Sequence, residues 1–247
     1  MRWLALVGAI GCGRLGFGVA GDASDDARDG ATDIAQGCGF DLCDNFETRT
    51  LAPVWTTSTM VSLDTTRAHG GAQAVHLQSA ALAVGQSQYV ELGEMQTLAV
   101  PATHFWVRGW FFLSALPAAG NAMELVAAEE LSGGLGDYVV VRSTDTLLYT
   151  KFVAATKSAP AVIPSDTWFC IAFEVLRATN STGSLALTSD VLPQTTLAPT
   201  QTDSQTAIQV IWFGVAFDGV NVTVPQPALD LWVDDVIVHS APVTCAD

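Results

Sequence analysis

The chain has 247 residues, 49% of them hydrophobic, and a formal net charge of −15, so its length allows one large β domain or two small ones. The acidic balance excludes nucleic acid, and an anionic membrane surface, as the main partner, because phosphate groups need a basic footprint. It also disfavours polyanionic sugars, unless a local basic spot such as Arg108 with Arg142 overrides the overall field.

The first twelve residues predict export. They contain a basic second residue and a short apolar run that ends in small residues, as in a signal peptide, whereas a transmembrane span needs about 20 apolar residues. Ala9-Ile-Gly-Cys12 resembles the bacterial lipobox, so Cys12 is the predicted lipidation site. We expect a bacterial outer-membrane or cell-surface lipoprotein, otherwise a secreted protein, that meets the membrane only through this lipid.

The next segment, residues 13–36, is acidic and poor in large apolar side chains. Such a composition cannot bury enough surface to order itself, so we expect a disordered tether. No domain boundary is visible further along the chain, and residues 37–247 are therefore predicted to form one folded domain.

The cysteine count suits an exported protein. With Cys12 assigned to the lipid, four cysteines remain, which suits two disulfides in an oxidising compartment. The sequence allows three pairings of Cys38, Cys43, Cys170 and Cys245. We favour Cys170 with Cys245, which would tie the tail to the domain, and Cys38 with Cys43. A link between Cys38 and Cys245 is the alternative.

The central stretch His104–Leu113 predicts a strand, because it is rich in aromatic and β-branched residues. Side chains alternate between the two faces of a strand. One face is apolar and carries Phe105, Val107, Gly109, Phe111 and Leu113. The other carries His104, Trp106, Arg108, Trp110 and Phe112, and we expect it to line the groove of an inner, concave sheet.

Flat aromatic rings beside a fixed donor suit a sugar, whose ring has an apolar face and a hydroxyl rim. Trp106, Arg108 and Trp110 are therefore the predicted sugar contacts, together with Arg142 and Tyr149. The alternative is an ordinary core strand with one ion-paired arginine, since large aromatic residues are common core material.

The rest of the chain predicts an all-β fold. Short apolar runs bounded by turn residues recur as far as 208–217, which indicates a two-sheet sandwich. The composition of residues 122–130 favours a helix, but their context favours a strand.

Several segments, taken in order, resemble concanavalin A-like lectin/glucanase jelly rolls. These segments are Asp44–Glu47, Trp55, Val61–Val75, Phe105–Leu113, Asp166–Glu174 and Leu229–Val238. The resemblance implies an antiparallel jelly-roll β-sandwich. Smaller carbohydrate-binding jelly rolls share the first and last segments and remain an alternative family.

This resemblance also implies a structural calcium ion between the first and last strands. Its predicted ligands are Glu47, Asp234 or Asp235, and carbonyl groups near residues 69–71, because calcium prefers hard oxygen ligands. Two adjacent aspartates inside an apolar strand are costly unless they are paired or bind metal. The alternative is that one points to solvent while the other caps a turn.

We therefore predict a surface-anchored, lectin-like protein that binds a polysaccharide or glycan and is not catalytic. One alternative is a structural or adhesion lipoprotein without sugar binding. Another is a polysaccharide lyase, in which Tyr149 and Lys151 act beside Arg108 and Arg142. A glycosidase is less favoured, because the nearest match, Glu124 with Glu129 and Glu130, lacks the middle aspartate of the expected Glu-x-Asp-x-x-Glu strand.

Overall fold

A computed structural model gives the fold of the chain. The structure describes residues 40–47, 50–94, 104–130, 135–151, 155–177, 184–197 and 208–246. The predicted signal peptide with Cys12, the predicted tether at 13–36 and Cys38 lie outside the described residues.

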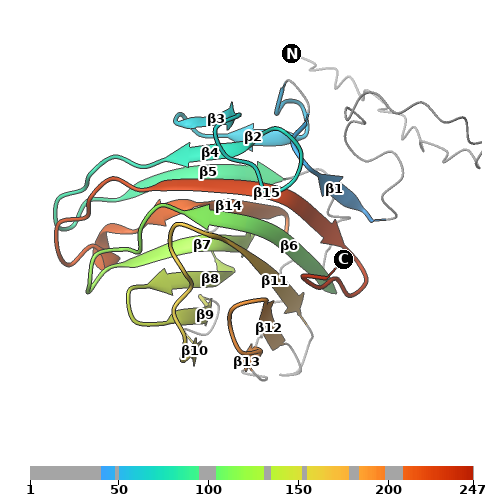
Figure 1. The fold of residues 1–247 in the computed structure, drawn as a ribbon. Helices are drawn as coiled ribbons and strands as arrows, with labels where there is room; N and C mark the ends of the chain where they lie inside the picture. Colours follow the sequence, from blue (N-terminus) through green and yellow to red (C-terminus); the bar gives the residue numbers. More distant parts are fainter. Residues whose placement is uncertain are drawn as a thin grey trace, which may run out of the picture.

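The described residues form two antiparallel sheets that lie as layers (Figure 1). The β6 sheet has the order β13-β12-β11-β6-β15-β4-β3, with β1 paired to β15, and the β14 sheet has the order β10-β9-β8-β7-β14-β5-β2. The all-β, two-sheet antiparallel β-sandwich that the sequence predicts is therefore confirmed.

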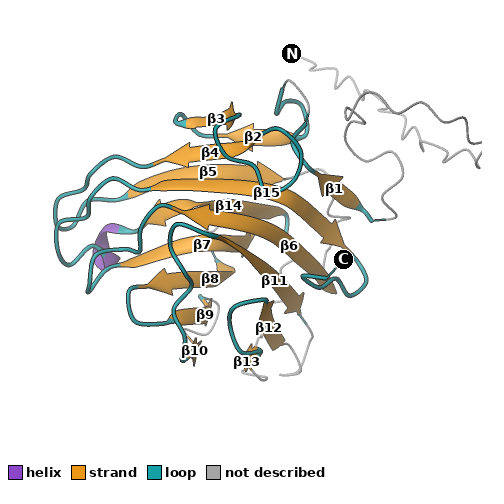
Figure 2. Cartoon of the chain, in the orientation of Figure 1, coloured by secondary structure: helices purple, strands orange, loops and turns teal. Residues whose placement is uncertain are grey.

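The strands of the β6 sheet are β1 (Leu42–Asp44), β3 (Val61–Asp64), β4 (Ala74–Gln78), β6 (His104–Leu113), β11 (Trp168–Leu176), β12 (Ser184–Ser189), β13 (Thr195–Leu197) and β15 (Asp230–His239). Those of the β14 sheet are β2 (Trp55–Thr57), β5 (Gln88–Glu94), β7 (Ala122–Glu129), β8 (Gly136–Arg142), β9 (Thr146–Thr150), β10 (Ala155–Ala159) and β14 (Val210–Phe217). Among the described residues, a single 3-10 turn, η1 (Gly219–Asn221), follows β14 (Figure 2).

The core lies between the sheets and follows the predicted alternation. Phe105, Val107, Phe111 and Leu113 of β6 are almost fully buried in one cluster with residues of the β14 sheet. The Phe111 ring lies 6.1 Å, centroid to centroid, from that of Phe213 on β14. The predicted apolar face of 104–113 is therefore the core face, and its even-numbered residues point to the outer face of the β6 sheet.

The segment with helical composition is a strand, as its context predicts. Residues 122–129 form β7, between β14 and β8. The pairing shifts register between Glu124 and Val126, which indicates a β-bulge. A bulge inserts one residue and thereby reverses the alternation beyond it. Glu124 and Glu129 therefore share the outer face, although they are five residues apart.

The disulfide between Cys170 on β11 and Cys245 in the C-terminal segment is confirmed, at a sequence separation of 75. Cys43 is also disulfide-bonded. The predicted partner of Cys43, Cys38, lies outside the described residues.

Candidate functional site

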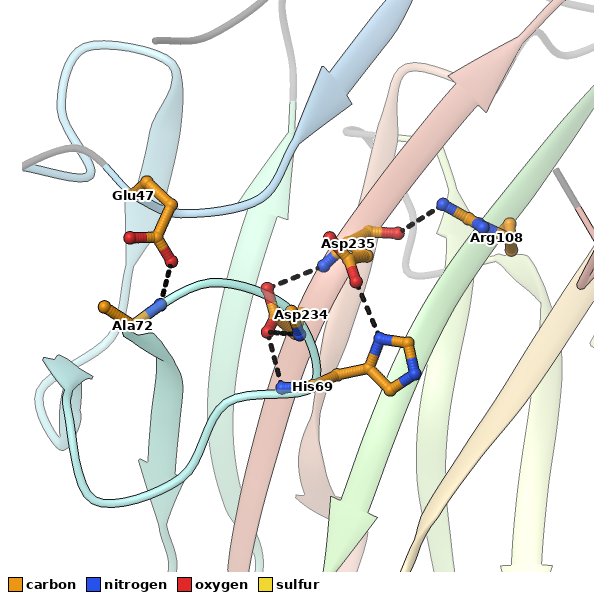
Figure 3. Close-up of polar contacts among 7 residues, drawn as sticks. Glu47, His69, Ala72, Arg108, Asp234 and Asp235 are labelled. Atoms are coloured by element: carbon orange, nitrogen blue, oxygen red, sulfur yellow. Dashed lines mark hydrogen bonds and ion pairs between the residues drawn. The ribbon is translucent and has the colours of Figure 1, made fainter. Parts of the chain in front are cut away.

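The predicted sugar contacts on β6 are already in contact with other side chains. The Trp110 ring stacks on His69 at 3.8 Å between centroids, and the Trp106 ring contacts His104 at 4.1 Å. Arg108 is 6% exposed and donates a hydrogen bond to the Asp235 carbonyl oxygen at 3.0 Å (Figure 3). Each of the two tryptophan rings therefore has a histidine ring packed against it, while both tryptophans stay partly exposed.

The other two predicted contacts, Arg142 and Tyr149, lie on β8 and β9 of the opposite sheet. The structure thus divides the five residues between the two outer faces of the sandwich. Trp106, Arg108 and Trp110 stay together on the β6 sheet, while Arg142 and Tyr149 meet in a cleft on the β14 sheet. The expectation of one shared groove is wrong.

This cleft on the outer face of the β14 sheet, called the β14-face cleft, has a volume of about 360 Å³. Its lining residues are Ala122, Glu124, Val140, Arg142, Leu147, Tyr149, Lys151, Thr156, Asp218, Val220 and Asn221. Glu124 pairs with Val140, and Val140 with Leu147, across β7, β8 and β9. The cleft therefore crosses the strands and is bounded at one side by η1.

Aromatic side chains form a second line across the same face. The pairing runs from Trp212 on β14 through Ala127 to Tyr138 on β8 and Tyr149 on β9. The rings of Tyr138 and Tyr149 stack at 5.7 Å between centroids, and Tyr149 lines the cleft. A half-buried aromatic ring beside polar groups is a typical wall of a ligand pocket.

Three carboxyl groups gather next to this aromatic line. The Tyr138 hydroxyl donates a 2.7 Å hydrogen bond to Glu129 Oε1. Burial, followed by the charge of Glu129, raises the pKa of Glu124 to about 7 and that of Glu91 on β5 to about 7. Near neutral pH, these two groups therefore exchange protons readily, as groups in functional sites often do.

Basic side chains are present, but one is neutralised. Arg142 Nε donates to Asp145 Oδ1 at 2.6 Å, and the Asp145 carboxylate raises the pKa of Arg142. Lys151 is exposed at the cleft and lowers the pKa of Glu124, against the larger effect of burial. The carboxyl groups thus outnumber the unpaired cations at this face.

The predicted calcium ligands hold a loop instead of meeting at one point (Figure 3). Asp234 Oδ2 accepts hydrogen bonds from the backbone N–H groups of His69 at 2.8 Å and Gly70 at 3.2 Å, and its Oδ1 accepts the Asp235 N–H at 2.8 Å. Glu47 Oε1 accepts the Ala72 N–H at 2.7 Å.

Burial, then the neighbouring Asp235, raises the pKa of Asp234 to about 7. Asp235 has φ 47° at a register shift of β15, and its carboxylate pairs with His69 at 2.7 Å. Within the described residues, no group of three or more His, Cys, Asp or Glu side chains could hold a metal ion. The carboxylates of Glu47 and Asp234 accept hydrogen bonds from backbone N–H groups. Calcium binding at these residues therefore stays a prediction.

No helix in the described part of the chain is long and apolar enough to cross a membrane. No family model matches the sequence, and no curated protein matches it.

Solved structures, by contrast, match the fold. Cellulose induced protein Cip1 is 19% identical with a TM-score of 0.56, over 82% of this chain and 92% of its own. An endo-β-1,4-glucuronan lyase from the fungus Trichoderma reesei is 14% identical with a TM-score of 0.57, over 83% of this chain and 92% of its own.

A structure of botulinum neurotoxin type C, whose cell entry depends on two ganglioside molecules, is 11% identical with a TM-score of 0.54. The match covers 77% of this chain but 43% of the toxin chain. These similarities show that the chain has a jelly-roll β-sandwich fold. Fold alone assigns no function.

Sequence reasoning missed Glu91, Tyr138 and Trp212. Glu91 and Tyr138 lie in two of the short apolar runs that predict strands, and Trp212 lies in the run 208–217. Alternation would have placed each on the face opposite the core. What the sequence lacked was the order of the strands, which brings β5, β14, β7 and β8 side by side.

Proposed function

We propose that this chain is a carbohydrate-binding β-sandwich protein that holds a glycan in the β14-face cleft. The observation that carries the proposal is the cleft itself, of about 360 Å³, with Tyr149 beside Glu124, Arg142 and Asn221. A concave site with an aromatic wall and a few polar groups suits a ligand with an apolar face and a hydroxyl rim. The similar solved structures include a glucuronan lyase and a neurotoxin whose cell entry depends on gangliosides, which supports this class of ligand.

Replacing Tyr149 with alanine should lower glycan affinity about tenfold, because the ring supplies the apolar contact of the cleft. Calorimetric titration with hexasaccharides of glucose, N-acetylglucosamine and glucuronic acid measures this change. Trp110→Ala is the matched control, since it removes an aromatic ring from the opposite outer face. If Trp110→Ala loses glycan binding and Tyr149→Ala does not, the glycan binds on the outer face of the β6 sheet instead.

A second candidate function is hydrolysis of the bound glycan. The sequence does not show a carboxylate pair, but the bulge in β7 places Glu124 and Glu129 on the same face. Glycosidases use two such carboxyl groups on either side of the scissile bond. Lyase chemistry on a polyuronide is less favoured, because Glu91, Glu124 and Glu129 would repel its carboxylates.

We also propose that calcium stabilises the 69–73 loop next to Glu47, Asp234 and Asp235. Saturating calcium at about 100 times its Kd would add about 2.7 kcal/mol of stability. Thermal unfolding in millimolar calcium, compared with EDTA, should therefore show a higher Tm by roughly 5 to 10 °C. Equal Tm values in both buffers would show that calcium does not stabilise this loop.

The N-terminal predictions complete the proposal. Export through residues 1–12 and lipidation at Cys12 would place the cleft at the outer membrane or cell surface, on a tether formed by residues 13–36. A lipid at Cys12 would be the only membrane contact.

A further inference from the structure

A small recess adjoins the β14-face cleft, and Glu124 lines both. The recess has a volume of about 10 Å³ and is lined by Glu91, Glu124, Leu125, Val126, Ala127, Trp212, Gly214 and Ala216. A space of roughly 10 to 15 Å³ holds one water-sized group. The recess is therefore the size of a single ammonium or hydroxyl group.

Two glycines allow close approach of β5 and β14 beside the recess. A Cβ atom at Gly214 would lie 2.6 Å from the Val90 carbonyl oxygen and 3.1 Å from Glu91 Cγ. At Gly93, a Cβ would lie 2.0 Å from the Trp212 ring, so this ring lies directly over the glycine. The Trp212 ring therefore packs on the backbone of β5 at Gly93 and also lines the recess.

The charges around the recess are mostly negative. The carboxyl groups are Glu91 and Glu124 on its walls, with Glu129 and Asp218 acting on Glu124 from nearby. Lys151 is the cation that acts on Glu124, and it is exposed. A cation inside the recess would lower the pKa of both wall carboxyl groups and make their ionisation favourable.

We propose that the recess between Glu91 and Glu124 binds the protonated amine of an amino-sugar unit in a glycan seated in the β14-face cleft. This inference rests on the proposed function and names the substrate class of the same site. An ammonium group offers three donors and one compact charge, which the carboxylates of Glu91 and Glu124, both lining the recess, would accept in charge-assisted hydrogen bonds. The Trp212 ring beside it adds a cation–π contact. An anionic sugar would be repelled.

The test compares two ligands that differ only in acetylation. A hexasaccharide of β-1,4-linked glucosamine and its fully N-acetylated counterpart are titrated calorimetrically at pH 6. The amine-bearing hexasaccharide should bind at least about tenfold more tightly, with an advantage that weakens at high salt. Titrations in two buffers of different ionisation enthalpy should reveal proton release on binding, because Glu91 and Glu124 give up protons to the solvent.

Glu91→Gln and Glu124→Gln should each reduce the difference between the two hexasaccharides to about twofold, since an amide cannot pair with the charge. Glu174→Gln makes the same chemical change on the β6 sheet and should leave the difference intact. Far-ultraviolet circular dichroism checks that all three variants fold.

Equal affinity for the two ligands, or an unchanged preference in Glu91→Gln and Glu124→Gln, would overturn the amine site and leave glycan binding standing. Absence of binding by both ligands and by the glucose hexasaccharide would overturn both proposals.

Discussion

Replacing Arg177 with methionine should cost the protein about 3 to 5 kcal/mol of stability, because it leaves a buried carboxylate without its partner. Arg177 directly follows β11 of the β6 sheet and donates from Nη2 to Asp137 Oδ2 on β8 of the β14 sheet at 2.8 Å. The side chains are 3% and 1% exposed. The pair joins the two sheets, and urea unfolding at pH 7 measures the loss.

The double variant Arg177→Met with Asp137→Leu should recover most of this stability, since apolar residues replace a buried pair at little cost. Arg142→Met is the control, because its pair with Asp145 is partly exposed and spans three residues, so we expect a loss of about 0 to 1 kcal/mol. The orphaned Asp137 can take up a proton, so the loss in Arg177→Met should shrink as the pH falls. Equal losses in Arg177→Met and Arg142→Met would contradict the role of the inter-sheet pair.

Local sequence pattern was sufficient for the strands and for their buried faces. Alternation along 104–113 assigned Phe105 and Phe111 to the core, because a strand with one apolar face has one way to bury it. Position alone suggested the bridge from Cys170 to Cys245. Context also identified 122–129 as a strand against its composition, since tertiary packing overrides helix propensity.

The proposed binding face was not predictable from the same pattern, for two physical reasons. The rings of Trp106 and Trp110 are covered by His104 and by His69, and the second contact depends on how a loop crosses the sheet. The carboxyl groups were hidden by the bulge, because strict alternation puts Glu124 and Glu129 on opposite faces. The His69 contact and the bulge are both set by pairing between distant segments, which a single sequence does not display.

If the cleft hydrolyses its glycan, Glu129→Gln and Glu124→Gln should each lower the rate about 10² to 10⁴-fold, the usual contribution of a general acid or base. Glu124 is the acid, because its pKa is raised to about 7 by burial and it therefore carries a proton near neutral pH. It would donate that proton to the glycosidic oxygen. Glu129, oriented by the Tyr138 hydroxyl at 2.7 Å, would take a proton from the water that adds to the anomeric carbon.

The direction in which the hydrolysis rate changes with pH is a further test of this prediction. The reactive form needs a protonated Glu124, so activity should fall as the pH rises through about 7. Release of reducing ends from soluble β-glucan, a neutral glycan that leaves Glu124 protonated, measures the rate, with Glu174→Gln as the control. If the glycan binds but no reducing ends are released, the protein does not hydrolyse it, and the acidic residues of the cleft act in binding alone. Equal rates in Glu129→Gln and the unaltered chain would show that cleavage, where observed, arises elsewhere.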